Sequence, residues 1–261
     1  MAQLVAFDGI EAVDDIVEGG EEDKQMPNQY LAFDIETAKV VPGEDFNWRP
    51  HRPLGISCAA TLASDSDEPL LWYGKTPDGS PEKQMSQQDA QGLVQYLSKM
   101  VADGFRILTW NGLGFDFDIL AEESGAAASC KEFALSHVDM MFHLFCVLGH
   151  PVGLEKAAQG MGLPGKQSGM SGFEAPKLWA EGHFEQVLEY VAQDARATMQ
   201  IAQTSAQRRS FAWITGKGAK RSMSLTNGWL SVREALQLPE PDTSWMSTPR
   251  SRQDFMAWMS A

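Results

Sequence analysis

Clusters of β-branched and aromatic residues divide the first half of the chain into short strands, which are separated by turn-forming residues. The expected strands are residues 30–35, 55–62, 69–73 and 106–110. Short connections between the first three predict an antiparallel meander. Ser86 and Asp89 have capping spacing, which predicts a helix to about residue 102. Its inward positions at helical spacing are Leu93, Val94, Leu97 and Val101. The strand after this helix is expected to join the sheet in parallel.

Helical periodicity dominates the second half of the chain. A glycine turn at 112–114 is followed by an expected helix over 115–123. Residues 130–148 and 183–214 are also expected to be helical, and the segment between them is rich in loops. This order predicts an α/β fold, with a mixed sheet of antiparallel and parallel strands flanked by helices.

Of the compositional features, charge has the most bearing on the expected function. The 261 residues carry a net charge of −14, which argues weakly against broad nucleic-acid binding. The charge is uneven, because residues 1–27 form an acidic arm and 208–221 is a basic stretch. The cations of this stretch are Arg208, Arg209, Lys217, Lys220 and Arg221. We interpret them as a nucleic-acid contact with Phe211 and Trp213 as stacking faces, or as ordinary solvated surface at a helix end.

Other features of the composition bear on compartment and domains. Three cysteines without a Cys-x-x-Cys pair argue against a disulfide framework or a zinc ribbon. No apolar run is long enough to span a bilayer and the N-terminus does not resemble a signal peptide, so we expect a cytoplasmic protein. The expected domains are the arm 1–27, a main domain 28–215, and a Trp-containing extension 216–261.

Two acids lie on one face of the first strand. Asp34 and Glu36 are two positions apart, so they point to the same side while Phe33 and Ile35 point to the other. Like charges on a mostly apolar strand repel each other, and a divalent cation between them would relieve the repulsion. The alternative is an exposed strand end with solvated acids.

Three further segments carry candidate acids. Asp116 follows the glycine turn at a helix start, where the helix dipole also favours an acid, and Asp118 is a second candidate. Tyr190 and Asp194 lie one turn apart on an apolar helix face. Arg196 is an alternative partner for Asp194. Asp139 has either an N-cap role or a role in the chemistry.

Together these segments resemble the three motifs of the DEDD 3′–5′ exonuclease superfamily. The motifs are Phe-Asp-Ile-Glu-Thr, Asn-Gly-x-x-Phe-Asp and Tyr-x-x-x-Asp, and the last is typical of the DEDDy branch. The chain is most similar to exonucleases related to the exonuclease domain of family B DNA polymerases, over about residues 29–205. The resemblance implies a ribonuclease H-like fold, which agrees with the order of strands and helices.

The resemblance also implies residue roles. Two Mg²⁺ or Mn²⁺ ions would be held by Asp34, Glu36, Asp116 and Asp194, and Tyr190 would orient the attacking water or act as its base. Thr37, Asn111 and Phe115 belong to the same motifs and would contact the nucleic acid.

The expected activity is two-metal hydrolysis at the 3′ end of a single strand, which releases nucleoside 5′-monophosphates. The likeness to polymerases favours DNA, and an exoribonuclease is the alternative. A second alternative is a silent module that binds nucleic acid or a polymerase. Because no polymerase motif is present, proofreading would require a polymerase or another replication or repair protein as partner.

Overall fold

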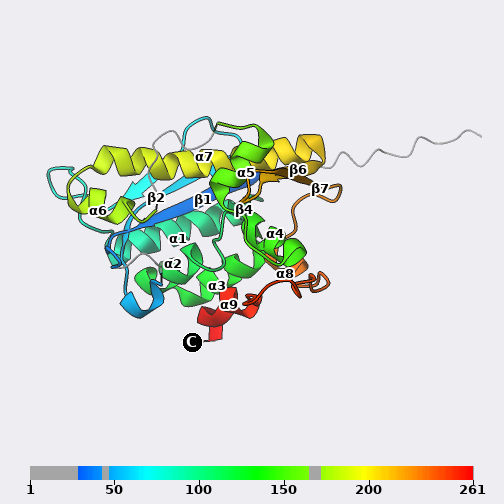
Figure 1. Ribbon diagram of the computed structural model, residues 1–261. Coiled ribbons are helices and arrows are strands. Elements are labelled where there is room, and N and C mark those ends of the chain that lie inside the picture. Colours follow the sequence, from blue (N-terminus) through cyan, green and yellow to red (C-terminus); the bar gives the residue numbers. More distant parts are fainter. Residues whose placement is uncertain (1–28, 43–46, 165–171, 261) are drawn as a thin grey trace, which may run out of the picture.

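A five-stranded mixed sheet forms the centre of the computed structural model, which describes residues 29–42, 47–164 and 172–260 (Figure 1). The strands are β1 (Tyr30–Thr37), β2 (Ile56–Ala63), β3 (Leu70–Tyr73), β4 (Arg106–Thr109) and β5 (Val138–Asp139). Their spatial order is β3-β2-β1-β4-β5. The pairs β3–β2 and β2–β1 are antiparallel, whereas β1–β4 and β4–β5 are parallel. The predicted α/β fold is therefore confirmed, while the acidic arm 1–27 lies outside the described residues.

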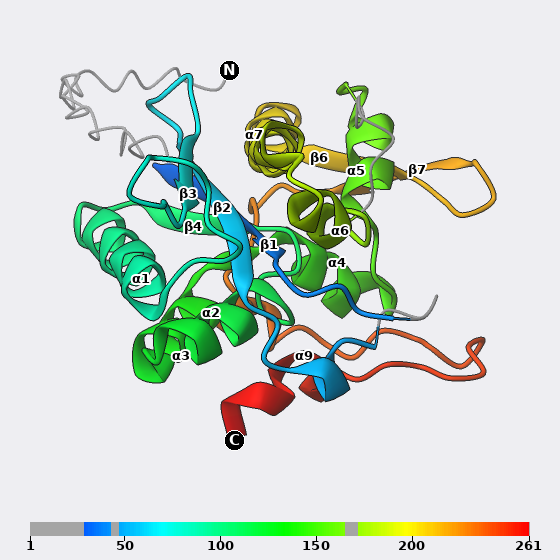
Figure 2. The ribbon, with the colours of Figure 1, turned by 90° about the vertical axis from the view of Figure 1, so that its left-hand side faces the viewer.

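Helices cover both faces of this sheet. In Figures 1 and 2, α7 runs along one face while α1, α2 and α3 cover the other. The helices up to α7 are α1 (Gln87–Ala102), α2 (Asp116–Ser124), α3 (Ala127–Ser136), α4 (Met140–Leu148), α5 (Leu154–Met161), α6 (Ala175–Ala180) and α7 (Phe184–Arg208), with the 3-10 helix η1 (Arg49–His51) before them. The predicted capping box of α1 is confirmed. Val101, expected to point inward, is 40% exposed, and Met100 is buried instead.

Strand β1 divides its side chains between two apolar clusters. Leu31, Phe33 and Ile35 pack in the cluster with α1 and α2. Ala32 points to the other face and packs in the cluster under α7. Asp34 and Glu36 continue the even series, because side chains alternate along a strand. The same alternation that builds the core therefore directs both acids toward α7.

Two of the expected helices are wrong in extent. The segment 130–148 is interrupted by β5, which pairs with β4 and separates α3 from α4. The segment 183–214 ends as a helix at Arg208, because Arg209 adopts a left-handed φ of 50°. Residues Ser210–Ile214 then form β6, in which alternate residues are buried, and pair with β7 (Lys220–Ser224). Helical periodicity did not reveal the end of the helix, because the apolar residues of β6 follow those of α7 directly in the sequence.

After β7 the chain returns to the main body. Helices α8 (Val232–Ala235) and α9 (Gln253–Met256), followed by the 3-10 helix η2 (Ala257–Ser260), place Val232, Phe255 and Trp258 in the core that α1 and α2 share. The boundary expected at residue 215 stays a prediction. Within the described ranges, no helix is both long enough and apolar enough to cross a membrane.

Candidate metal centre

Three carboxylates from two elements meet between the sheet and α7. Asp34 and Glu36 come from β1 and Asp194 from α7, and one carboxylate oxygen of each lies within 4.8 Å of the others. Glu36 and Asp194 are buried and Asp34 is half-buried. Three acids at this separation repel each other, and an all-oxygen donor set suits a hard divalent cation. The residues present therefore fit a divalent metal ion.

The carboxylates open into a cavity of about 510 Å³. It brings together all the motif residues that the sequence singled out, which are Asp34, Glu36, Thr37, Asn111, Phe115, Asp116, Tyr190 and Asp194. Segments about 160 positions apart thus contribute to one space. The five cations of the basic stretch are not among its lining residues.

Tyr190 lies one helical turn before Asp194 and is 3% exposed. Burial raises the pKa of its hydroxyl, and the negative charges of Asp194 and Glu36 raise it further. Without a bound cation, the hydroxyl therefore stays protonated near neutral pH and is a hydrogen-bond donor.

Asp116 begins α2 and lines the same cavity, but it is outside the group of three carboxylates. Its Oδ1 accepts a hydrogen bond from the Ile35 backbone N–H at 3.1 Å, so it is tied to β1 between the two strand acids. Burial raises the pKa of Asp116, and the nearby charge of Asp139 adds to the effect. A cation bound in the cavity would lower the pKa of Asp116 and so counteract both effects.

Asp139 fixes the turn that leads into α2. Its carboxylate accepts backbone hydrogen bonds from Asn111 at 3.0 Å, Leu113 at 2.9 Å and Phe142 at 2.9 Å. The last of these caps α4, so the N-cap interpretation is confirmed. The first two hold a turn in which Asn111 has a φ of 80°. Asp139 thus positions Asn111 and Asp116 without lining the cavity.

Ion pairs define the positions of Asp118 and Arg196. The Oδ1 of Asp118 lies 2.7 Å from Nη1 of Arg52, and Asp118 does not line the cavity. Arg196 pairs with Glu68 at 2.9 Å and with Glu189 at 3.3 Å. Arg196 is therefore not the partner of Asp194.

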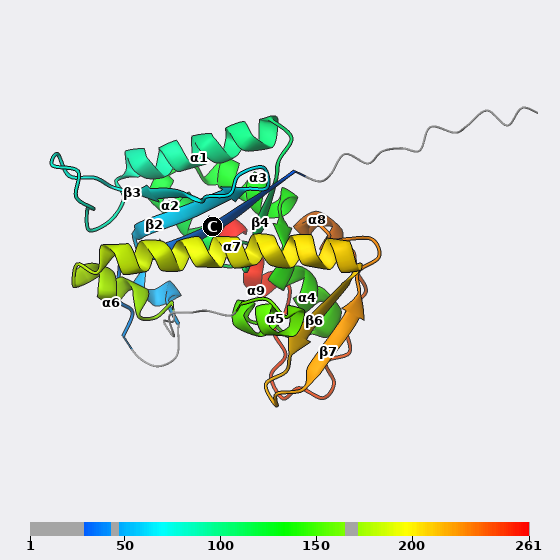
Figure 3. The same cartoon turned by 90° about the horizontal axis from the view of Figure 1, so that it is seen from above.

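The basic stretch lies at the far end of α7. Figure 3 shows the β6–β7 hairpin, which carries Lys217, Lys220 and Arg221, starting at the C-terminal end of this helix and extending to its side, next to α5. Arg208 donates to the carbonyl of Met161 at 2.7 Å, and Arg209 to that of Thr226 at 3.5 Å. The expected stacking role of Phe211 and Trp213 is wrong, because they are 0% and 7% exposed and stack on each other in the core.

Two aromatic residues of the cavity were not assigned to it from the sequence. Trp110 lines it and donates through Nε1 to the Val152 carbonyl at 2.9 Å. Phe173 lines it while 46% exposed. Trp110 directly precedes Asn111 of the second motif, so its position in the sequence could have indicated a place in the cavity. Nothing local in the sequence marks Phe173 in this way.

A likeness to one solved structure agrees with this architecture. The chain is similar to the family B DNA polymerase from the hyperthermophilic archaeon Pyrobaculum calidifontis, with a TM-score of 0.50 and 19% identity over 69% of this chain and 24% of that one. It thus spans about a quarter of the polymerase. E. coli exonuclease I in complex with a 5cy-dT13 oligonucleotide matches with a TM-score of 0.39 and 14% identity, over 70% of this chain and 41% of that one. At such identities the polymerase likeness concerns the fold alone. No curated protein matches the chain.

A family model settles the membership of the chain. The model of the RNase H superfamily matches residues 74–206, which is half of the chain and includes β4, α2 and most of α7. The order of strands and helices agrees with the ribonuclease H-like fold that the motifs implied. The chain therefore belongs to the RNase H superfamily.

Proposed function

We propose that the chain is a metal-dependent nuclease, and specifically a two-metal 3′–5′ exonuclease of the DEDDy type. One observation carries this proposal: oxygens of Asp34, Glu36 and Asp194 lie within 4.8 Å of one another in a cavity that Asp116 and Tyr190 also line. Superfamily membership supports it.

The carboxylates have different roles in this proposal. Asp34 would help to hold both ions, Glu36 and Asp194 would hold the ion next to the attacking water, and Asp116 would hold the second ion. Bound Mg²⁺ or Mn²⁺ would activate water and offset negative charge on the departing 3′ oxygen. In the reaction, the water oxygen forms a bond to phosphorus and the bond from phosphorus to the 3′ oxygen breaks. The products are a nucleoside 5′-monophosphate and a strand with a new 3′-hydroxyl.

The other residues act on the water and on the strand. Tyr190 orients the attacking water or accepts its proton, with its hydroxyl beside Asp194. Thr37, Asn111 and Phe115 contact the 3′-terminal nucleotide, because all three line the same cavity. The cations at the end of α7 contact only a longer strand. These are Arg208, Arg209, Lys217, Lys220 and Arg221.

Single-stranded DNA is the proposed substrate, and a polymerase or another replication or repair protein is the proposed partner. The fold likeness to a family B polymerase supports both. Sugar discrimination depends on contacts to the 2′-hydroxyl, so an exoribonuclease remains the alternative activity.

Digestion of 5′-labelled oligomers tests this function. We expect a ladder that shortens from the 3′ end in Mn²⁺ or Mg²⁺, faster for single-stranded DNA than for duplex DNA or RNA. A 3′-phosphate should block digestion, and a circular single strand should be inert. Cutting of the circle would show endonuclease action, and no cleavage of any oligomer would favour a silent binding module.

A further inference from the structure

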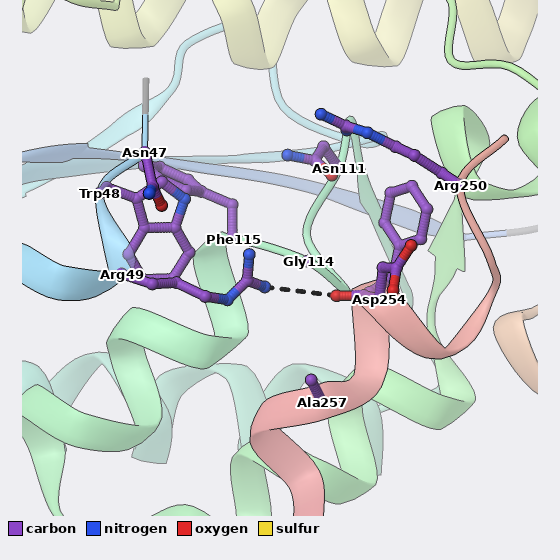
Figure 4. Close-up of a pocket in the computed structure, with 10 residues that line it drawn as sticks. Asn47, Trp48, Arg49, Asn111, Gly114, Phe115, Arg250, Asp254 and Ala257 are labelled. Atoms are coloured by element: carbon purple, nitrogen blue, oxygen red, sulfur yellow. Dashed lines mark hydrogen bonds between the residues drawn. The ribbon is translucent and has the colours of Figure 1, made fainter. Parts of the chain in front are cut away.

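A second cavity, of about 840 Å³, adjoins the carboxylate cavity (Figure 4). The two share Asn111 and Phe115, so they meet at the turn before α2. The other walls come from residues 47–49 and from 250–257 near the end of the chain. Its volume is within the range of about 300–1,000 Å³ that is typical of ligand sites.

The C-terminal segment, residues 249–260, packs directly on this turn. Trp258 is 8% exposed and donates from Nε1 to the Leu113 carbonyl at 2.8 Å. A Cβ atom on Gly114 would lie 3.0 Å from Cδ1 of Phe255, so the glycine permits the close approach of α9. The C-terminal segment is therefore a packed wall of the cavity.

A buried arginine anchors the same segment. Arg252 is 5% exposed, and its guanidinium donates to four backbone carbonyl groups. The acceptors are Leu236 at 3.1 Å, Leu238 at 2.8 Å, Pro239 at 2.8 Å and Cys146 at 3.3 Å. Because Arg252 is held in this way, Arg250 two positions earlier is kept at the rim of the cavity.

Two exposed arginines give the cavity its positive charge. Figure 4 shows the Arg250 side chain extending from the C-terminal segment in the direction of Asn111. No hydrogen bond or ion pair with another residue of the described ranges engages Arg250. Arg49 lies 4.8 Å over the Trp48 ring and donates to the Asp254 carbonyl at 3.4 Å.

One acid, Asp254, is among the described residues that line the cavity with these cations. The Asp254 carboxylate accepts a hydrogen bond from the Ser251 backbone N–H at 2.8 Å, which ties it to its own segment. Among the described residues that line the cavity there are thus two arginines and one tethered acid, which gives this lining a net positive charge in a chain of net charge −14. A polyanion entering the carboxylate cavity requires such a positive surface next to it.

We propose that this second cavity binds the single strand immediately before its 3′-terminal nucleotide, with Arg250 and Arg49 contacting the phosphates. The inference rests on the proposed function and adds the C-terminal segment to the binding surface. A strand that leaves the carboxylate cavity past Asn111 and Phe115 enters this space, because the two cavities share these residues. The half-buried Phe115 ring offers a stacking face at the junction.

Paired charge removals test the inference. Arg49→Gln/Arg250→Gln removes both cavity cations, and Lys99→Gln/Arg233→Gln removes two exposed cations from α1 and α8 as a matched control. Fluorescence anisotropy in EDTA measures affinity for an eight-nucleotide single-stranded DNA. Each single-strand phosphate contact contributes about 0.7 to the log–log salt slope, so the cavity variant should bind roughly 10–30-fold more weakly at 0.1 M salt, with a slope flatter by about 1.4. The control should change by less than about 3-fold.

A small substrate separates this inference from the proposed function. The p-nitrophenyl ester of thymidine 5′-monophosphate has no preceding nucleotide, so its Mn²⁺-dependent hydrolysis should be the same in the cavity variant and the wild type. If the wild type cannot hydrolyse this ester or any oligomer, the proposed function fails, while the anisotropy result still decides the binding inference.

A single substitution distinguishes the loss of a phosphate contact from misfolding as the cause of weaker DNA binding. Arg250→Gln removes a side chain that makes no hydrogen bond or ion pair within the described ranges, so it should leave the melting temperature unchanged and flatten the salt slope by about 0.7. Wild-type affinity in the cavity variant, or an equal loss in the matched control, would overturn the inference.

Discussion

Asp194→Asn should make the metal-free protein more stable while it weakens metal binding. The substitution removes one charge from three carboxylates whose oxygens lie within 4.8 Å. At an effective dielectric constant of about 20, each ionised pair at that distance repels by about 3 kcal/mol. Solvent at the half-exposed Asp34 screens its charge and reduces this value. We therefore expect the free energy of unfolding in EDTA to rise by about 1–3 kcal/mol.

Urea denaturation in EDTA and calorimetric titration with Mn²⁺ measure the two effects. Affinity for Mn²⁺ should fall by roughly 10–100-fold or more, because a ligand itself is lost. Glu189→Gln is the matched control on the same helix: its carboxylate is exposed and paired with Arg196, so stability should change by at most about 1 kcal/mol and metal affinity should not change. A less stable Asp194→Asn protein with unaltered Mn²⁺ affinity would refute the interpretation of the cluster as a charge-strained metal site.

Three further substitutions test the site and the packing around it. Tyr190→Phe keeps the ring and deletes the hydroxyl, so single-turnover cleavage should slow by about 10–1000-fold with unchanged calorimetric Mn²⁺ affinity. Gly160→Ala would push a Cβ atom into the backbone of Trp213, where α5 meets β6, and urea denaturation should show a loss of about 1–3 kcal/mol. Burial lowers the pKa of His143 to about 4, whereas the unfolded value is about 6.5. The neutral ring therefore contributes stability above about pH 6.5 that is lost as the pH falls toward 4, and between pH 7 and 5 the wild type should lose about 2 kcal/mol more than His143→Gln.

The sheet and the acid cluster were predictable because they follow from local periodicity. Alternation along β1 directs Asp34 and Glu36 to one face, and helical spacing brings Tyr190 and Asp194 to one side of α7. The order of the motifs predicts that these segments share a site, and all of them line one cavity.

What escaped prediction depends on contacts between distant segments. The left-handed turn at Arg209 and the pairing of β6 with β7 decide where α7 ends, and helical periodicity does not record either. Arg250 is one isolated charge in the sequence, and its place at the second cavity depends on the buried contacts of Arg252 and Trp258. Packing of this kind leaves no periodic signal in the chain.

The most direct test of the central claim is an anomalous difference map from crystals of the wild-type protein soaked in Mn²⁺. We predict a Mn²⁺ peak between the carboxylates of Asp34, Glu36 and Asp194, within bonding distance of an oxygen from each. The peak should disappear in Asp34→Asn crystals soaked in the same way. A map without a peak at these three residues, or with Mn²⁺ bound only elsewhere on the chain, would contradict the account.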